Sequence, residues 1–403
     1  MGKSVITREY YAHKLDAWLG KRQIIVLTGQ RRVGKSFVLR DFINRHIADD
    51  KANIIYVNKE KKEFDNIKTS SELNEYIDSR FAADKHNYIL VDEIQEIDGW
   101  EKSVRSYRLE DNTDIIITGS NSTMLSGELG TLIGGRYQEV FVQPLTYNEF
   151  LQFHKLADTE DSLRQYLCYG GLPGLRQTGL EDEDMVSEYL AGVFNTIMLK
   201  DIIERHSIRN ITFLNNLIRF FADTIGKLNS INNISNYLKS CGQDVSAKTV
   251  SVYLDYFREA YLVASVRRYD VHGKKILESN DKLYFGDVGL RNMIAGGERE
   301  SDMEKVIENV VYLHLIHMGY KVHVGQLRAG EVDFVCTRTG DRRYVQVAYI
   351  IADDSTRQRE FGSLENINDN YPKYVISMTP LVKRSDYNGI IHLDLREFLR
   401  NGF

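Results

Sequence analysis

The chain has 403 residues, of which 42% are hydrophobic and 27% are charged; this is ordinary for a globular protein and long enough for two or three domains. Residues 1–22 are polar and charged, and no apolar run approaches the ~20 residues of a membrane span, so we expect a cytoplasmic protein without a membrane partner. The net charge is −5, and the three isolated cysteines argue against a disulfide framework or a zinc site.

The first predicted elements surround a glycine-rich loop. An apolar strand at residues 24–28 leads into Gly29–Ser36, with the sequence GQRRVGKS, and a helix follows. This is the phosphate-binding pattern, in which glycines let backbone N–H groups turn toward an anion at a helix amino terminus. Lys35 is expected on the β- and γ-phosphates and Ser36 on Mg²⁺. The expected nucleotide-binding residues are Gly29, Gln30, Arg31, Arg32, Val33, Gly34, Lys35, Ser36 and Phe37.

Two acidic residues follow a later strand. After a predicted strand at residues 53–58 and a helix, residues 88–93 form four apolar residues followed by Asp92 and Glu93. At the carboxyl end of a buried strand, Asp92 is placed to share Mg²⁺ with Ser36. Glu93 has the longer side chain, and we expect it to polarise the water that attacks the γ-phosphate.

Polar residues also flank the next two predicted strands. The strand at residues 114–118 ends in Gly-Ser-Asn, so Ser120 or Asn121 is placed to sense the γ-phosphate, although a turn alone would select the same residues. Arg136 precedes a strand at 139–143 and is expected either to stabilise transition-state charge, in its own chain or in a neighbouring subunit, or to form a surface ion pair. The candidate catalytic residues are Lys35, Glu93, Asn121 and Arg136.

Five strands alternating with helices, the first ending in the glycine-rich loop, predict an α/β P-loop NTPase fold with a parallel sheet covered on both faces. Ligands of such sheets bind beyond the carboxyl ends of the strands. The ordered motifs GQRRVGKS, YILVDEIQEIDGWE, IIITGSNSTML, GGRY and VQPLTYNEF resemble those of AAA-type P-loop ATPases of bacteria and archaea. This resemblance implies ATP as the nucleotide, Mg²⁺ as its metal, and an added strand between the loop strand and the Asp-Glu strand.

Residues 146–206 have a helical pattern that is interrupted by the turn Tyr169–Gly174. Together with the resemblance, this pattern predicts a small helical lid over the nucleotide. The expected domains are residues 1–145 for the ATPase core, 146–206 for the lid, 207–300 for the next module and 301–403 for the carboxyl-terminal domain.

Residues 208–275 carry a net charge of +5 and the rest of the chain −10, so this segment is the expected nucleic-acid-binding region. Apolar spacing predicts three helices, the third capped by Ser246, and then strands at 262–269 and 282–285. This order is typical of a winged helix-turn-helix with a basic hairpin as its wing. The alternative is a protein-interaction module. The expected DNA contacts are Lys248, Thr249, Ser251, Arg267, Arg268, Lys274 and Lys275.

The carboxyl-terminal residues resemble a small α/β restriction-endonuclease-like domain, in which a helical Glu, a strand Asp and a Glu/Gln-x-Lys strand gather on one metal. Ala348 stands where that family has its lysine, and Gln346 brings no negative charge, so we expect an inactive nuclease domain. Lys373 is the candidate for a displaced lysine. The residues that match the acidic positions are Glu308, Glu331 and Asp333.

These predictions combine into an ATP-driven switch acting on DNA or on a protein partner, with Glu93 supporting hydrolysis. One alternative is a nucleotide-gated nucleic-acid-binding or protein-interaction regulator with little turnover. The other is an ATP-regulated nuclease, which Ala348 disfavours. The sequence leaves the physiological partner and the oligomeric state open.

Overall fold

The structure is a computed structural model that describes residues 5–122, 133, 135–242, 245–277, 280–297, 300–328, 330–380 and 384–403. The chain divides into two compact units: unit 1 comprises residues 1–143 and 259–261, and unit 2 comprises residues 144–258 and 262–403. Within the described ranges, no helix combines the length and the apolar character that crossing a membrane requires. The expected domain boundaries inside unit 2 remain predictions.

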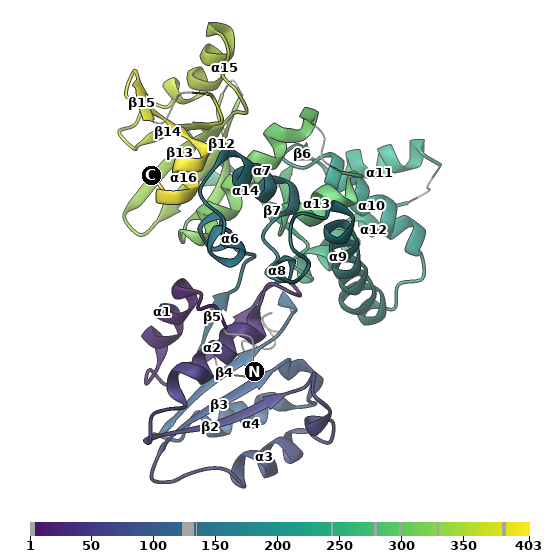
Figure 1. Ribbon diagram of the computed structural model, residues 1–403. Coiled ribbons are helices and arrows are strands. Elements are labelled where there is room, and N and C mark those ends of the chain that lie inside the picture. The colour runs from purple at the N-terminus through teal and green to yellow at the C-terminus, as the bar shows by residue number, and fades with distance from the viewer. Residues whose placement is uncertain are drawn as a thin grey trace. The chain divides into compact units, whose positions relative to one another are not determined.

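Unit 1 contains a five-stranded sheet with the strand order β2-β3-β4-β1-β5, in which every pairing is parallel. Strand β4 lies between β1 and β3, as the resemblance implied (Figure 1). The elements of unit 1 are α1 Glu9–Trp18, β1 Ile24–Thr28, α2 Lys35–His46, β2 Ala52–Asn58, η1 Lys62–Phe64, α3 Ser70–Asp78, β3 His86–Asp92, η2 Ile94–Glu96, α4 Trp100–Tyr107, β4 Thr113–Thr118 and β5 Tyr137–Phe141.

Apolar runs explain why β1 and β4 occupy the middle of this sheet. Every residue of both strands is buried, as expected for parallel strands that are covered on both faces. Helices α1 and α2 lie on one face, and α3 and α4 lie on the other (Figure 1). Trp100 and Val104 of α4 join alternate strand residues such as Val26 and Ile117 in one apolar core. The predicted P-loop NTPase sheet is therefore confirmed.

Unit 2 begins with helices and ends in a mixed sheet. The helical pattern predicted from residue 146 onward is present, and its last part is a π-helical segment, η4. The elements are α6 Tyr147–His154, α7 Glu160–Tyr169, α8 Leu175–Thr178, α9 Glu183–Thr196, η4 Ile197–Glu204, α10 Ile211–Asp223, β6 Leu228–Asn229, α11 Ile231–Ser240, α12 Ala247–Glu259, β7 Val263–Val266, β8 Arg268–Asp270, β9 Lys275–Ile276, β10 Asp281–Phe285, α13 Val288–Ile294, η5 Glu300–Asp302, α14 Met303–His317, β11 Lys321–Gln326, β12 Glu331–Arg338, β13 Asp341–Val347, α15 Asp354–Glu365, β14 Lys373–Ser377, β15 Arg384–Tyr387, β16 Ile390–Asp394 and α16 Leu395–Asn401.

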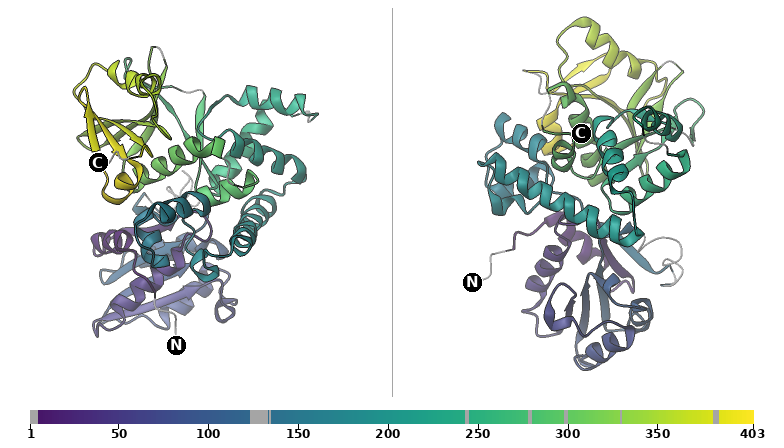
Figure 2. Two further views of the ribbon diagram at one scale, coloured as in Figure 1. Left: turned by 45° about the horizontal axis from the view of Figure 1, so that its top comes forward. Right: turned by 90° about the vertical axis from the view of Figure 1, so that its right-hand side faces the viewer.

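The strands of unit 2 form two sheets. A three-stranded antiparallel sheet has the order β6-β10-β7, and an eight-stranded sheet has the order β15-β16-β14-β13-β12-β11-β8-β9. The left-hand view of Figure 2 shows α13 and α14, in green, between the teal helices α10–α12 and the yellow carboxyl-terminal strands. Helix α14 packs against strands of both sheets.

The prediction of a single strand at residues 262–269 is wrong, because this segment forms two strands, β7 and β8, which belong to different sheets. Strand β7 pairs with β10, and the pairing ends where Val266 lies opposite Lys282, near the start of β10. The residues after Val266 do not continue this pairing, and β8 instead pairs in parallel with the edge of β11. The unpaired N–H and C=O groups of a sheet edge favour this extension. The basic hairpin therefore belongs to the carboxyl-terminal sheet.

Candidate functional site

The glycine-rich loop follows β1 and leads directly into α2. Gly29 has a φ of 137°, and a Cβ atom there would lie 2.2 Å from the carbonyl oxygen of Val142. Gly34 has a φ of 99° and is the residue before α2. Only glycine tolerates such close backbone approach together with positive φ. The loop is thus held as a tight turn at a helix amino terminus.

The interior of the loop has the donors that a polyphosphate needs. Lys35 is buried, and its Nζ donates to the carbonyl oxygens of Gly29, at 2.9 Å, and Gln30, at 3.1 Å. Gln30 is 2% exposed, and neither the nitrogen nor the oxygen of its buried side-chain amide has a hydrogen-bond partner in the described part of the chain. A buried unpaired amide is costly, and a phosphate oxygen would satisfy its N–H group. The loop therefore fits a nucleotide phosphate chain.

Asp92 lies at the carboxyl end of β3 and is fully buried. The hydroxyl of Thr118 donates to its Oδ1 at 2.6 Å, and Ser36 forms a further side-chain hydrogen bond with it. Burial raises the pKa of Asp92, and these hydrogen bonds partly oppose the shift. Since a hydroxyl and a carboxylate are oxygen ligands that Mg²⁺ accepts, the Ser36 and Asp92 pair fits a shared magnesium ion.

Glu93 follows β3 in a left-handed conformation with a φ of 57°. Its backbone N–H donates to the Thr118 hydroxyl at 2.9 Å. Its carboxylate accepts hydrogen bonds from Gln95 and, at 3.5 Å, from the Ser120 hydroxyl. Positive φ at a residue other than glycine is strained, and such strain concentrates at functional sites. The side chain of Glu93 is therefore held at the carboxyl edge of the sheet, next to Asp92.

Thr118 is a site residue that the motifs in the sequence do not single out. Its one hydroxyl donates to Asp92 and accepts from the Glu93 backbone, so it fixes both acidic residues. A hydroxyl directly after the apolar run at residues 115–117, at the carboxyl end of the strand, is the signal that could have found it. Of the predicted neighbours, Ser120 reaches Glu93, and Asn121 is 3% exposed.

The role predicted for Arg136 in its own chain is wrong. The carbonyl oxygen of Arg136 accepts the N–H of Ile24, so this arginine lies at the amino ends of β1 and β5. The phosphate loop is at the carboxyl end of β1, which is five residues long and therefore spans roughly 15 Å. Arg136 does not reach the loop of its own chain. Its action in a neighbouring subunit stays a prediction.

The remaining loop residues differ in exposure. Arg31 is half-buried, and Arg32 is exposed with a φ of 72°. Phe37 is 49% exposed, and the Arg40 guanidinium lies 5.1 Å from the centre of its ring. Val33 is buried, so it contributes its backbone rather than its side chain.

The basic residues of unit 2 are only partly available to a ligand. Lys248, Arg267, Lys274 and Lys275 are exposed. Arg268 is instead half-buried and donates a hydrogen bond to Gln326 of β11. On α12, Ser251 is half-buried, and the hydroxyl of Thr249 lies 2.9 Å from that of Ser246, whose oxygen caps the helix. The expected role of Arg268 as a DNA contact therefore does not fit its position.

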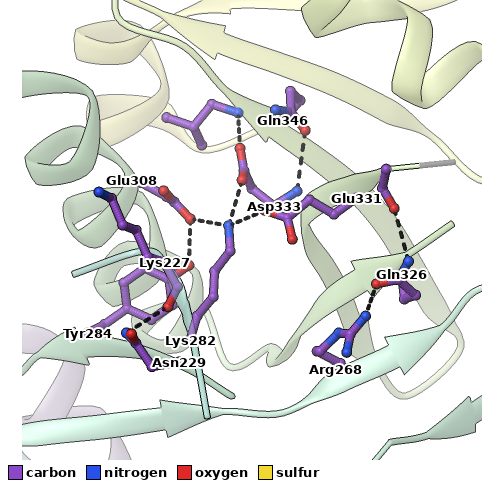
Figure 3. Close-up of polar contacts among 12 residues, drawn as sticks. Lys227, Asn229, Arg268, Lys282, Tyr284, Glu308, Gln326, Glu331, Asp333 and Gln346 are labelled. Carbon is purple, nitrogen blue, oxygen red and sulfur yellow. Dashed lines mark hydrogen bonds and ion pairs between the residues drawn. The ribbon is translucent and has the colours of Figure 1, made fainter. Parts of the chain in front are cut away.

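The carboxyl-terminal acidic residues do come together, but around a lysine that the sequence motifs do not mark. Figure 3 shows Lys282 between Glu308 and Asp333. The proposed substitute Lys373 lies elsewhere and donates to the carbonyl oxygen of Asp369 at 3.1 Å. In the sequence, Lys282 is marked only by its place next to Asp281, directly before the apolar residues 283–285. Ala348 is buried in an apolar core.

Comparisons with known proteins agree with this arrangement. A sequence-family model described as an AAA domain matches residues 21–151, and a second one, described as a domain of unknown function, matches residues 160–301. An uncharacterized protein of Haemophilus influenzae is 37% identical over 387 residues, which cover 94% of each chain. An uncharacterized protein of Methanocaldococcus jannaschii is 32% identical over 363 residues, which cover 85% of this chain and 78% of that protein.

Among solved structures, the chain is similar to the Walker-type ATPase of Pyrococcus abyssi. The TM-score is 0.52 and the sequence identity is 17%, with 72% of this chain and 95% of that chain covered. At this identity the likeness concerns the fold, which agrees with the parallel sheet of unit 1.

Proposed function

The chain belongs to the same family as the Haemophilus influenzae and Methanocaldococcus jannaschii proteins and carries an AAA domain, and from this premise we propose that it binds MgATP and hydrolyses it. One observation carries the proposal: Lys35, Asp92 and Glu93 lie at the carboxyl edge of one parallel sheet, beside a loop whose buried Gln30 amide has no partner among the described residues. This edge is where α/β sheets bind their ligands.

Each residue has a distinct part in the proposed reaction. The loop N–H groups and Lys35 hold the phosphates, and Lys35 exchanges its two carbonyl contacts for phosphate oxygens. Ser36 and Asp92 hold Mg²⁺, which neutralises charge on the phosphates. Glu93, released from Gln95 and Ser120, orients the attacking water.

Phosphate release from ATP tests the proposal most directly. We expect Lys35→Ala to lower turnover at least ~100-fold, because the transferred phosphoryl group loses its cation. Lys21→Ala is the matched control, since Lys21 is an exposed lysine of the same unit. Turnover that is independent of Lys35 would contradict an ATPase at this loop.

A second variant separates hydrolysis from binding. We expect Glu93→Gln to retain ATP affinity while turnover falls about 100-fold, because the amide cannot accept a proton from water. The exposed Glu96 provides the control Glu96→Gln. Equal turnover of Glu93→Gln and the wild type would remove Glu93 from the mechanism.

A role on DNA is the second candidate function. Helix α10 is followed by strand β6, helices α11 and α12, and strands β7 and β10, and the three strands form the antiparallel sheet β6-β10-β7. This element order is that of a winged helix, and Lys248 is exposed on the third helix. Because β8 and β9 extend another sheet, we propose that Lys248, Arg267, Lys274 and Lys275 contact phosphates rather than base edges.

Fluorescence polarisation with duplex DNA at low salt tests this second function. We expect Lys248→Ala/Lys274→Ala/Lys275→Ala to weaken binding and to reduce the salt slope by about 0.9 for each phosphate that is no longer neutralised. Lys62→Ala/Lys85→Ala is a control that removes exposed lysines from unit 1. No binding by the wild type at low salt would leave a protein-interaction role. ATP turnover with duplex DNA, single strands or RNA added then identifies any stimulating nucleic acid.

A further inference from the structure

A buried ammonium group lies at the centre of the acidic cluster of unit 2, which consists of Glu308, Glu331 and Asp333. The Nζ atom of Lys282 is 2.9 Å from Glu308 Oε1, 2.9 Å from Glu331 Oε1 and 3.0 Å from Asp333 Oδ1. The lysine side chain is 2% exposed. An ammonium group has three N–H donors, so these three oxygens satisfy all of them.

The four residues come from elements that are distant in the sequence. Lys282 lies on β10 of the three-stranded sheet, Glu308 lies on α14, and both Glu331 and Asp333 lie on β12 of the eight-stranded sheet. The ammonium group therefore joins one sheet to the other through side chains, in addition to the main-chain pairing of β8 with β11.

The other polar groups nearby also face inward and are occupied. Tyr284, two residues after Lys282, donates its hydroxyl to Glu308 Oε1 at 2.6 Å. The second oxygen of Asp333 accepts the backbone N–H of Val347 at 3.0 Å. Figure 3 shows Glu308 and Asp333 directed at the lysine nitrogen and the Tyr284 hydroxyl directed at Glu308. The carboxylates are thus oriented toward an internal cation.

Gln346 does not complete a metal site. Its Oε1 accepts the backbone N–H of Asp333 at 3.3 Å, and its Nε2 donates to Glu360 at 3.0 Å. Across the described ranges, no three His, Cys, Asp or Glu side chains are arranged so that they could hold a metal ion. A divalent cation among the three carboxylates would also have to displace the ammonium group or lie against it, and like charges repel strongly where water is excluded.

We propose that Lys282 is the resident cation of this cluster, so that the wild-type protein takes no divalent metal there and uses the four charges to hold its two sheets together. A buried ion cluster of this kind specifies one arrangement of the elements that contribute to it. Loss of the ammonium group would leave three carboxylates facing one position. The carboxylates would have to draw closer than their present spacing around the ammonium group, in which they do not hold a metal, and that position would then accept a divalent cation with oxygen ligands.

The proposal is tested by measuring Mn²⁺ binding to the full-length, nucleotide-free protein with electron paramagnetic resonance. All variants carry Asp92→Asn, which removes the magnesium ligand of the ATP site and makes the result independent of the proposed ATPase. With Lys282 present, we expect no bound Mn²⁺. Lys282→Met should gain one Mn²⁺ and a rise in melting temperature on adding Mn²⁺, and Lys282→Met/Asp333→Asn should lose both.

Two results would overturn the proposal. The first is Mn²⁺ bound by the protein that retains Lys282 and lost in Asp333→Asn, because the cluster would then be a metal site in the wild type. This comparison does not depend on whether Lys282→Met folds. The second is a folded Lys282→Met protein without bound Mn²⁺, since the lysine would then not occupy a cation position.

Discussion

At the scale of single residues, Arg8 supports the phosphate loop through hydrogen bonds to the backbone of the loop and of the segment after β5. It is buried, and its Nη1 donates to the carbonyl oxygens of Val33, at 3.2 Å, and Gln143, at 2.9 Å. Tyr11 accepts the backbone N–H of Gln143 at 2.9 Å. The first helix therefore fixes the loop to the segment after β5, although nothing in the sequence marks these residues.

We expect Arg8→Ala to weaken ATP binding about tenfold, because two buried carbonyl groups lose their donor and the loop loses its support. Arg8→Lys can restore one of the hydrogen bonds and should have an intermediate dissociation constant. Arg22→Ala removes an exposed ion pair with Asp111 and serves as the control. The measurement is titration with a fluorescent ATP analogue, and unchanged affinity of Arg8→Ala would contradict the supporting role.

Asp287 is a buried carboxylate whose protonation depends on the fold. Burial raises its pKa to about 6, partly opposed by hydrogen bonds from the N–H groups of Gly171, at 2.8 Å, and Leu290, at 3.0 Å. Because the folded-state pKa exceeds the unfolded value, folding favours the protonated form. The resulting stability is fully present below the unfolded pKa near 3.8 and is lost as the pH rises through about 6.

The free energy of unfolding should therefore be roughly 1 kcal/mol lower at pH 7.5 than at pH 5 through this group alone. Asp287→Asn should remove that difference, and the exposed Asp84→Asn should retain it. Urea unfolding at the two pH values measures both. An equal pH dependence in Asp287→Asn and the wild type would contradict the assignment.

At the scale of elements, α13 is fixed to its neighbours by a fully buried arginine. The Nε of Arg291 donates to the carbonyl oxygen of Ala222 near the end of α10, and its Nη2 lies 2.8 Å from Asp302, just before α14. Asn292 donates to the carbonyl oxygens of Leu167 and Cys168 in α7, both at 2.9 Å. Three helices thus share α13 as a common partner.

We expect Arg291→Ala to lower the free energy of unfolding by about 3 kcal/mol, because Asp302 stays buried without its guanidinium partner. Lys305, at 2.7 Å from Asp302, keeps the loss from being larger. Arg258→Ala removes an exposed pair with Asp255 and should cost less than ~1 kcal/mol. Equal losses in the two variants, measured by urea unfolding, would contradict this difference.

The elements also show how far a sequence predicts structure. The five strands of unit 1 were predictable because apolar runs, glycine positions and polar strand ends all agree there. The sheet to which the hairpin β8-β9 belongs was not predictable, because it depends on which sheet edge lies nearby rather than on the residues of the hairpin. The role of Lys282 was not predicted for the same reason: its three partners lie 26 to 51 residues further along the sequence, and no local sequence pattern indicates these contacts.

At the scale of the whole molecule, the division into two compact units predicts how the chain responds to nucleotide. If the two units unfold independently, a ligand raises the free energy of unfolding only of the unit that contains its binding site. The proposed ATP site lies wholly within residues 1–143, so nucleotide should stabilise unit 1 selectively.

Calorimetry of Glu93→Gln with MgATP should therefore show one transition moved upward and another left in place. At a concentration of 100 times the dissociation constant, the gain is about 2.7 kcal/mol. Adding Lys35→Ala should abolish the shift. An equal shift of all transitions would contradict independent unfolding of the two units.

The alternation of side chains along β10 has a consequence for changes in chain length. Lys282 and Tyr284 share the face that meets the acidic residues, while Leu283 between them is buried on the other face. A slip of one residue in the pairing with β7 would turn Leu283 toward three carboxylates and bury the ammonium group among apolar side chains. Insertions in the connection between β7 and β10 should therefore be tolerated only where they leave the pairing register of β10 with β7 unchanged. Natural length variation should accordingly be found in the connecting loop rather than within the strand.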